Sequence, residues 1–252
     1  MTTREAINKV LRGLRQFGLL MESGTSSTTD DYLLMILQFL NEAKEEIEES
    51  GWAWQALRQT VTVTLSASTS EYTLTAAGNA DVNTNDRTRL LYETVHEGGR
   101  TEGFRIGSSS RAQVFDVTDS SEHRLKQWTQ EKMERVHFTD DNETSERPTH
   151  FAIYADTDNL KMKVYPTPSE TRTLKMRLFI PQAELSSTAL ETTSITIPSR
   201  PVWTKALLKA NQERGDELGK EGSTLWLAYT DAHSAAVGIE MSPADSTVFL
   251  ER

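Results

Sequence analysis

The sequence predicts an α+β protein, with helices from both ends of the chain in one bundle and an antiparallel β-sheet or sandwich inserted between them. Two observations support this prediction. Near both ends, apolar residues recur every three or four positions, as on the buried face of a helix. From about residue 59 to 198, apolar and polar residues alternate, as in half-buried strands. Short turns between these strands favour antiparallel pairing, and therefore the α+β class.

Residues 1–58 are expected to form the first two helices of the bundle. A Gly/Ser/Thr linker separates them at residues 24–29, where Thr28 and Asp31 resemble a capping box. Ser50 and Gly51 end the second helix. The apolar stripe of the first helix is Ile7, Val10, Leu11, Leu14 and Phe17. The stripe of the second is Leu33, Ile36, Leu37, Leu40, Ala43 and Ile47.

The second helix also has a strongly acidic face. It consists of Glu42, Glu45, Glu46, Glu48 and Glu49. A solvated carboxylate has nothing to raise its pKa, so these residues are not expected to act as catalytic acids. We expect a solvated face, or a surface that faces a channel or another subunit and repels phosphate.

Two indoles, Trp52 and Trp54, follow at strand spacing in Gly51-Trp52-Ala53-Trp54. Such a pair can stack on bases or sugars, or anchor a protein interface. Because it stands where a helix gives way to a sheet, we expect core packing that holds this junction.

Residues 59–198 are expected to form the β domain. Alternation predicts strands near residues 61–65, 72–74, 90–96, 104–106, 151–153, 160–164 and 174–180, and a short last strand at 195–197. Gly98-Gly99 is typical of a hairpin turn. A helical insert is expected near residues 109–136, where Leu125, Trp128, Met133 and Val136 form a thin stripe.

Residues 199–240 are expected to complete the bundle with two helices. Ser199-Arg200-Pro201 begins the first, and Gly215 or Gly219 ends it. Its stripe is Trp203, Ala206, Leu207 and Ala210, and the next helix, from about Ser223, presents Trp226, Tyr229, Ala236 and Val237. Residues 241–252 are expected to be an extended tail, since Pro243 discourages a helix. The apolar Val248, Phe249 and Leu250 suggest that this tail docks on a partner.

Composition excludes several classes of site. The 252 residues include no cysteine, which removes disulfides, thiolate catalysis, cysteine-ligated zinc and iron–sulfur clusters. With 27 basic and 37 acidic residues, the net charge of −10 excludes a wholly basic surface for nucleic acid, though not a local basic patch.

The longest apolar run, residues 32–40, is far short of the ~20 residues of a membrane span, so no membrane association is expected. The basic stretch 4–15 is expected to be a helix of the fold and not a transit peptide.

No motif predicts catalysis. The chain has no phosphate loop, dinucleotide fingerprint, nucleophile elbow or zinc-protease motif. The nearest approach to a metal site is His137, Asp140, Asp141, Glu143 and His150. Their spacing matches no ligand motif, so we expect no metal, no cofactor and no enzymatic activity. Two alternatives stay open, a β-sandwich module that binds carbohydrate receptors and a metal-dependent hydrolase in the His137–His150 region.

Four segments, in order, resemble the adaptor proteins of short-tailed phages, a family related to tail tubular protein A. They are Ala6-Ile7-Asn8-Lys9-Val10-Leu11, Leu40-Asn41-Glu42-Ala43-Lys44 with the double-tryptophan segment, Glu146-Arg147-Pro148-Thr149-His150-Phe151 with Pro166-Thr167-Pro168, and Ile197-Pro198-Ser199-Arg200-Pro201. The resemblance spans about residues 5–237. The segments 76–89 and 109–136 are longer than this layout implies.

The resemblance implies a structural virion protein at the head–tail junction, made in the host cytoplasm. Its copies would form a dodecameric ring that connects the portal protein to the tail nozzle protein. Genomic DNA would pass through the ring without specific binding. An acidic wall suits this passage, because adhesion to DNA grows with each phosphate neutralised.

Overall fold

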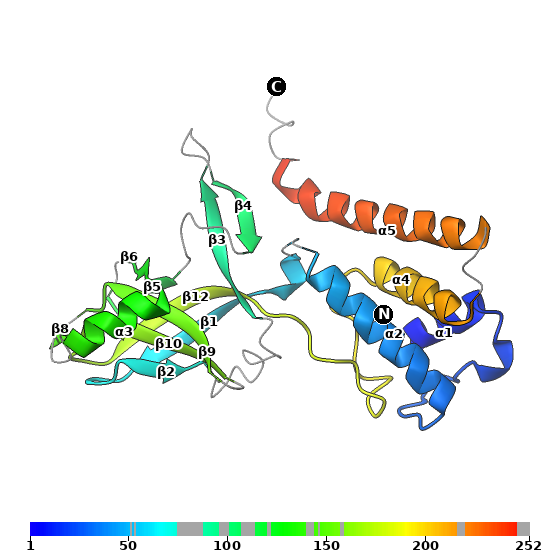
Figure 1. The fold of residues 1–252 in the computed structure, drawn as a ribbon, viewed down its shortest axis with the longest axis horizontal. Coiled ribbons are helices and arrows are strands. Elements are labelled where there is room, and N and C mark those ends of the chain that lie inside the picture. The colour runs from blue at the N-terminus through cyan, green and yellow to red at the C-terminus, as the bar shows by residue number, and fades with distance from the viewer. Residues whose placement is uncertain are drawn as a thin grey trace. The chain divides into compact units, whose positions relative to one another are not determined.

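The computed structural model describes residues 1–50, 52, 54–74, 88–95, 101–106, 114–119, 122–139, 144–145, 147–156, 159–215 and 220–245. It confirms the α+β class (Figure 1). The chain forms two compact units. The helical unit comprises Met1–Ala56 and Glu184–Arg252, and the β unit comprises Leu57–Ala183.

The helical unit begins with α1 (Thr3–Gly13). Thr2 and Glu5 form a capping box at its start, and its predicted apolar stripe is buried as far as Leu14. The prediction for Phe17 is wrong, since this side chain is exposed in the short 3-10 helix Phe17–Leu19. The chain turns away there because the buried Asn8 amide holds the backbone of Met21, donating to its carbonyl at 2.8 Å and accepting from its N–H at 2.9 Å.

Helix α2 (Asp31–Glu48) buries all six residues of its predicted stripe. Its N-cap is Asp30, whose Oδ1 accepts from the backbone N–H groups of Tyr32 and Leu33. The predicted capping box at Thr28 is therefore wrong by two positions, and Thr28 instead accepts from the N–H of Asp30. Asn41, in the second half of α2, holds the segment around Leu185. Its side-chain amide donates to the carbonyl of Leu185 and accepts from the N–H of the same residue.

Two further helices, α4 (Ser199–Glu213) and α5 (Lys220–Asp245), complete the helical unit (Figure 1). Helix α4 packs against α1, α2 and α5 and buries Val202, Ala206, Leu207 and Ala210. Gly215 follows its C-cap at φ +73°, the left-handed conformation that favours glycine.

The β unit contains two main sheets (Figure 1). In the first, β12 (Arg172–Phe179) pairs antiparallel with β1 (Arg58–Leu65), β3 (Arg89–Val95) and β5 (Val114–Asp116). Strands β4 (Thr101–Ile106) and β6 (His123–Arg124) extend its edges. The second sheet has the order β2 (Glu71–Thr73), β10 (Asn159–Tyr165), β9 (His150–Asp156) and β7 (Lys126–Gln127). A small parallel pair joins β8 (Thr144–Ser145) to β11 (Thr167–Pro168).

Residues from both main sheets form the core of the β unit. Val61, Leu174, Met176 and Leu178 contribute from the first sheet, and the second adds residues such as Phe151. Alternation along each strand gives one buried face, as expected for packed sheets. Helix α3 (Gln130–Thr139) lies against β9 and β10 and buries Met133 and His137.

The predicted helical insert at 109–136 is largely wrong. Among the described residues of this range only those of α3 are helical, while β5, β6 and β7 occupy other parts of it. Val114 in β5 and Leu125 between β6 and β7 are buried in the core, and two isolated apolar positions have no helical or strand periodicity. The last strand predicted at 195–197 is also wrong. Ile195 and Ile197 are buried, but the backbone there forms a single antiparallel bridge, between Thr2 and Ser194.

The extended conformation predicted for residues 241–252 is wrong for residues 241–245. Helix α5 continues through Gly238 and Pro243 to Asp245, so 241–245 are helical. Residues 246–252, which include Val248, Phe249 and Leu250, lie outside the described residues, as do the Gly98-Gly99 turn and most of the segment 76–89. Within the described part of the chain, none of the helices has both the length and the apolarity needed to cross a membrane.

Candidate protein–protein interface

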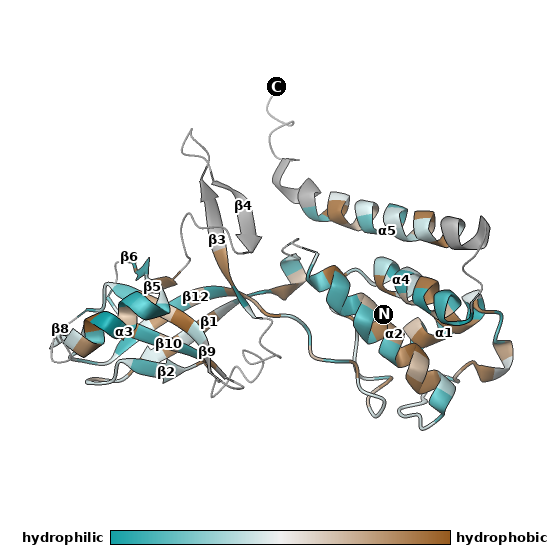
Figure 2. Ribbon diagram, viewed as in Figure 1, coloured by the Kyte–Doolittle hydropathy of each residue, from teal (hydrophilic) through white to brown (hydrophobic). Residues whose placement is uncertain are grey.

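Helix α5 exposes an apolar surface. Leu227 is 60% exposed, Ile239 73% and Trp226 53%. The sequence of residues 224–239 has one Asp and no Lys, Arg or Glu, and Figure 2 shows apolar and near-neutral segments along this helix. A helix that is nearly uncharged around its whole circumference is normally buried. The exposed side chains of Trp226, Leu227 and Ile239, here called the α5 surface, point to different sides of the helix and mark α5 as a candidate protein interface.

Other residues of α5 anchor it within the helical unit. Ala232 and Ala236 are buried, which allows close packing against α4. Lys205 of α4 lies 5.0 Å from the centre of the Tyr229 ring. Near the end of the helix, Glu240 accepts hydrogen bonds from the Gln55 backbone and side chain at 3.1 and 3.2 Å. These contacts hold the α5 surface in a fixed orientation within the unit.

The acidic cluster of α2 is not a uniform solvated face. Lys209 of α4 contacts Glu42 at 3.0 Å and Glu46 at 2.7 Å, and Lys205 contacts Glu46 as well. Burial would raise the pKa of Glu46, but the hydrogen bonds from Lys205 and Lys209 outweigh it and leave that pKa below its ordinary value. Burial would lower the pKa of Lys209, but the hydrogen bonds from Lys209 to Glu46 and Glu42 outweigh this effect and leave that pKa above its ordinary value. Part of the cluster therefore joins α2 to α4.

Glu48 is fully buried, and its carboxylate lies 3.6 Å from the equally buried Lys44 ammonium. Glu48 thus cannot belong to a surface of the helical unit, which corrects its expected solvation. Glu49 is exposed and Glu45 half-exposed, so these two remain candidates for a channel-facing or subunit-facing surface.

The two tryptophans have different surroundings. Trp54 is fully buried, its Nε1 donates to the carbonyl of Ile47 at 3.1 Å, and its ring meets the His233 ring edge-on at 5.9 Å. Trp52 is half-buried, and its Nε1 is buried without a hydrogen-bond partner among the described residues. The contacts of Trp54 lie in the helical unit, between α2 and α5. Burial, together with Lys205, lowers the pKa of His233 and keeps this neighbour neutral.

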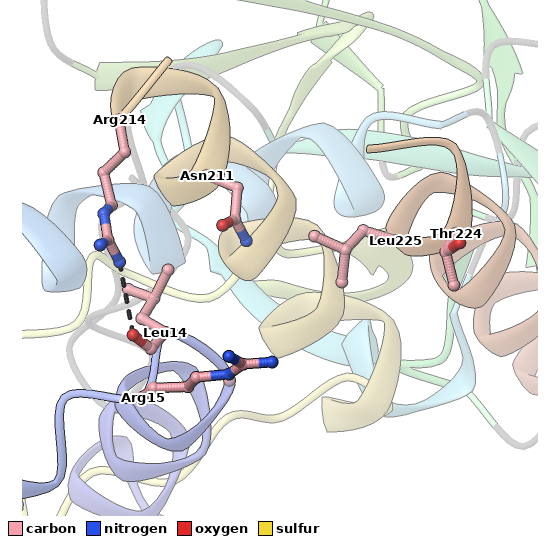
Figure 3. A pocket seen from close by; sticks show the side chains of 7 residues that line it. Leu14, Arg15, Asn211, Arg214, Thr224 and Leu225 are labelled. Carbon is pink, nitrogen blue, oxygen red and sulfur yellow. Dashed lines mark hydrogen bonds between the residues drawn. The ribbon is translucent and has the colours of Figure 1, made fainter. Parts of the chain in front are cut away.

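A cavity of about 400 Å³ lies among the ends of α1, α4 and α5 (Figure 3). Arg15 and Asn211 line it, and Leu225 of α5 faces them. Arg214 also lines it and donates to the carbonyl of Leu14 at 3.4 Å. Close packing beside the cavity depends on Gly13, because a Cβ there would lie 2.6 Å from Leu207 Cδ2. No sequence pattern indicates this cavity, because its residues come from segments about 200 positions apart.

Arg15 occupies a left-handed backbone position at φ +60°. It closes a Schellman motif at the end of α1, in which Gln16 donates to Leu11 at 2.9 Å and Arg15 to Arg12 at 3.1 Å. The equivalent position after α4 is Gly215, the residue type that this motif favours. No glycine signal marks Arg15 in the sequence, so the turn could not be predicted.

No sequence pattern indicates a second feature, a charge cluster of the β unit in which Arg172 and Asp116 are buried. Arg172 contacts Asp119 at 2.8 Å and Asp116 at 3.9 Å, and Arg147 lies 3.6 Å from Asp116 and also pairs with Asp119. Hydrogen bonds from Arg172 and Arg147 hold the pKa of Asp119 below its ordinary value. Arg147 belongs to the Arg-Pro-Thr segment quoted above, which therefore has a structural role here.

The histidines considered as metal ligands have other partners. His137 Nε2 lies 3.1 Å from the carbonyl of Val164. The His150 ring stacks on Trp128 with centroids 3.8 Å apart, and burial, with Lys126 and Lys132, lowers its pKa. Asp140, Asp141 and Glu143 lie outside the described residues, and the described ones contain no group of three or more possible metal ligands. Lys132 covers Trp128 at 4.2 Å, so this ring is not an open stacking platform.

Two comparisons with known proteins bear on this chain. No curated protein matches it. The sequence profile of the SU10 adaptor protein family matches residues 1–237. This range includes all the described helices and strands before α5, and most of α5 itself. On this match over almost its whole length, the chain belongs to the SU10 adaptor protein family.

Proposed function

We propose that this protein forms a ring at the head–tail junction of a phage, connects the portal protein to the tail nozzle protein, and continues the DNA channel between them. Membership of the SU10 adaptor family supports a structural, non-enzymatic role as a phage head-to-tail adaptor. The observation that favours assembly is the α5 surface, whose apolar side chains remain exposed in the single chain. The relation to tail tubular protein A and the twelvefold ring belong to this proposal.

A closed ring needs two different faces on each copy, one fitting the opposite face of its neighbour. The α5 surface supplies one such face. Burying a leucine or isoleucine side chain contributes ~1.5–3 kcal/mol, so Leu227 and Ile239 together can offset much of the cost of association.

DNA passage requires a channel wall that does not hold phosphate. The chain's net charge of −10 suits such a wall. Glu45 and Glu49 are the members of the acidic cluster that we assign to a channel-facing or subunit-facing surface. We also propose that Val248, Phe249 and Leu250, beyond the end of α5, dock on the portal or on a neighbouring adaptor.

Negative-stain microscopy of the full chain, alone and with purified portal protein, tests this function. Rings are expected for the wild type, and Leu227→Glu or Ile239→Glu should abolish them while leaving the circular dichroism spectrum intact. Phe138→Glu is the matched control, because Phe138 is 91% exposed but lies in the β unit. A wild-type chain that stays monomeric at every concentration, with and without portal, would contradict the proposal.

A further inference from the structure

The cavity at the ends of α1, α4 and α5 has the chemistry of a carboxylate site. Arg15 and Arg214 present guanidinium groups at it, and Asn211 adds a side-chain amide (Figure 3). Leu14 and Leu225 form an apolar part of the wall. None of the described residues that line this site, here called the arginine cavity, is acidic. Guanidinium groups bind carboxylates through paired hydrogen bonds, and the leucines suit the aliphatic stem of a glutamate.

The backbone at Arg15 is a second and independent observation. A non-glycine residue at φ +60° is strained, and such strain persists where the surrounding structure or a function maintains it. Gly215 shows that the same motif in the same unit is built with glycine elsewhere. The arginine at position 15 therefore costs stability that a glycine would restore, while it supplies a cation at the cavity.

A complementary groove lies elsewhere on the helical unit. It has a volume of about 350 Å³, and Leu34, Leu37, Glu42, Glu45 and Glu184 are among its lining residues. The described residues that line this acidic groove include no lysine or arginine, and none of them lines the arginine cavity. Copies with a net charge of −10 repel one another unless basic and acidic patches meet locally. Two distinct and complementary patches are what a closed ring requires.

We propose that the arginine cavity of one copy faces the acidic groove of the next copy in the ring, with Arg15 paired to Glu184 and Glu45 of its neighbour. This inference rests on the ring of the proposed function and names the contact that closes it. The occupant of the cavity is a second copy of this chain.

Disulfide trapping tests the contact directly, because the natural chain has no cysteine. Arg15→Cys and Glu184→Cys are introduced into separate full-length chains with tags of different size, which are mixed, allowed to assemble and oxidised. Covalent heterodimers are expected to exceed both homodimers by about tenfold or more. A mixture of Ser68→Cys and Glu184→Cys chains, with Ser68 in the β unit, is the control and should give only background.

A substitution that removes the backbone strain at Arg15 distinguishes a binding role of this residue from a structural one. Arg15→Gly should raise the melting temperature and weaken self-association by at least about tenfold. Ser68→Gly relieves the same backbone strain at φ +61° and should raise the melting temperature with self-association unchanged. Exchanging the two charges tests the pairing of Arg15 with Glu184. Arg15→Glu and Glu184→Arg should each prevent assembly, and the double variant should restore it.

The outcomes distinguish this contact from the ring itself. Wild-type rings without the heterodimer, or full assembly of Arg15→Gly, overturn the contact and leave the proposed function standing. A monomeric wild type overturns both. If Arg15→Gly lowers affinity for a double-stranded DNA fragment and leaves self-association unchanged, the cavity binds phosphate and the proposed contact is wrong.

Discussion

Single residues set the geometry of the helical unit where the sequence is least regular. Trp54 follows α2 and contacts both that helix, through Ile47, and α5, through His233. Asn8 and Asn41 each hold a distant backbone with a pair of hydrogen bonds. Both asparagines lie in the segments that resemble the phage adaptors, which gives those segments a role in the fold.

Replacing Trp54 with alanine should lower the stability of the helical unit by ~3–5 kcal/mol, since the side chain is fully buried. Thermal unfolding followed by circular dichroism measures this effect. Trp52→Ala should cost less because Trp52 is half-buried. Equal, small effects of both substitutions, with a lost binding activity instead, would show that the indoles serve recognition.

At the same scale, Arg172→Ala should destabilise the β unit by roughly 3–5 kcal/mol, because it leaves the buried Asp116 carboxylate short of a cation. Urea denaturation gives the difference. Lys175→Ala on the same strand is the control, since this side chain is exposed and its loss should change stability by less than about 0.5 kcal/mol. Similar unfolding curves for both variants would contradict a structural role for the cluster.

At the scale of elements, ion pairs join α2 to α4. The pKa of Glu46 lies below its ordinary value of 4.5 in the folded protein. The unfolded chain therefore binds more protons between the two values, and stability rises with pH through that window. The contribution of Glu46 is present above pH 4.5 and disappears as the pH falls through the lower, folded pKa.

Glu46→Gln should thus lower the melting temperature by a small amount at pH 7 and by progressively less as the pH falls through the lowered, folded pKa. The effect is small because the Glu46 side chain is 46% exposed and solvent screens it. Melting curves from pH 3 to 8 for wild type and variant give the comparison. A stability difference that does not change with pH would mean that packing, and not charge, connects the two helices here.

Sequence periodicity predicted the elements whose buried face is long. The buried apolar residues of α1 as far as Leu14, of α2 and of β12 are the ones that the helical and strand periodicities predicted. It failed where elements are two or three residues long, as at Val114 and Leu125, because a period needs several repeats. The site was harder to predict, since Glu46 meets Lys205, and Arg172 meets Asp119, only after distant segments pack together. Helix α5 continues through Pro243, although the proline alone predicted its end before that position.

At the scale of the whole molecule, net charge and the end of the chain bear on assembly. A surface dominated by carboxylates repels DNA, so the isolated protein should bind a double-stranded fragment weakly and with little dependence on salt. Fluorescence anisotropy at several salt concentrations measures both. Tight binding that falls steeply with salt would contradict a channel that lets DNA slide.

Deleting residues 246–252 removes the apolar tail and leaves α5 intact. Folding should be nearly unchanged, and attachment to the portal should weaken, because Val248, Phe249 and Leu250 can each contribute ~1.5–3 kcal/mol when buried. Circular dichroism and co-sedimentation with portal protein report on the two properties. Attachment at full strength would show that the tail has no part in docking.

The helical unit is assembled from both ends of the chain, and this has a consequence for its synthesis. Helices α1 and α2 leave the ribosome first but bury their stripes only after α4 has been made. At ~5–20 residues per second, the delay is on the order of 10 s. The β unit, Leu57–Ala183, is contiguous and can fold during this interval. Because α5 is translated after the other described helices, a chain that terminates before it lacks the α5 surface, which on our proposal excludes such a copy from the ring.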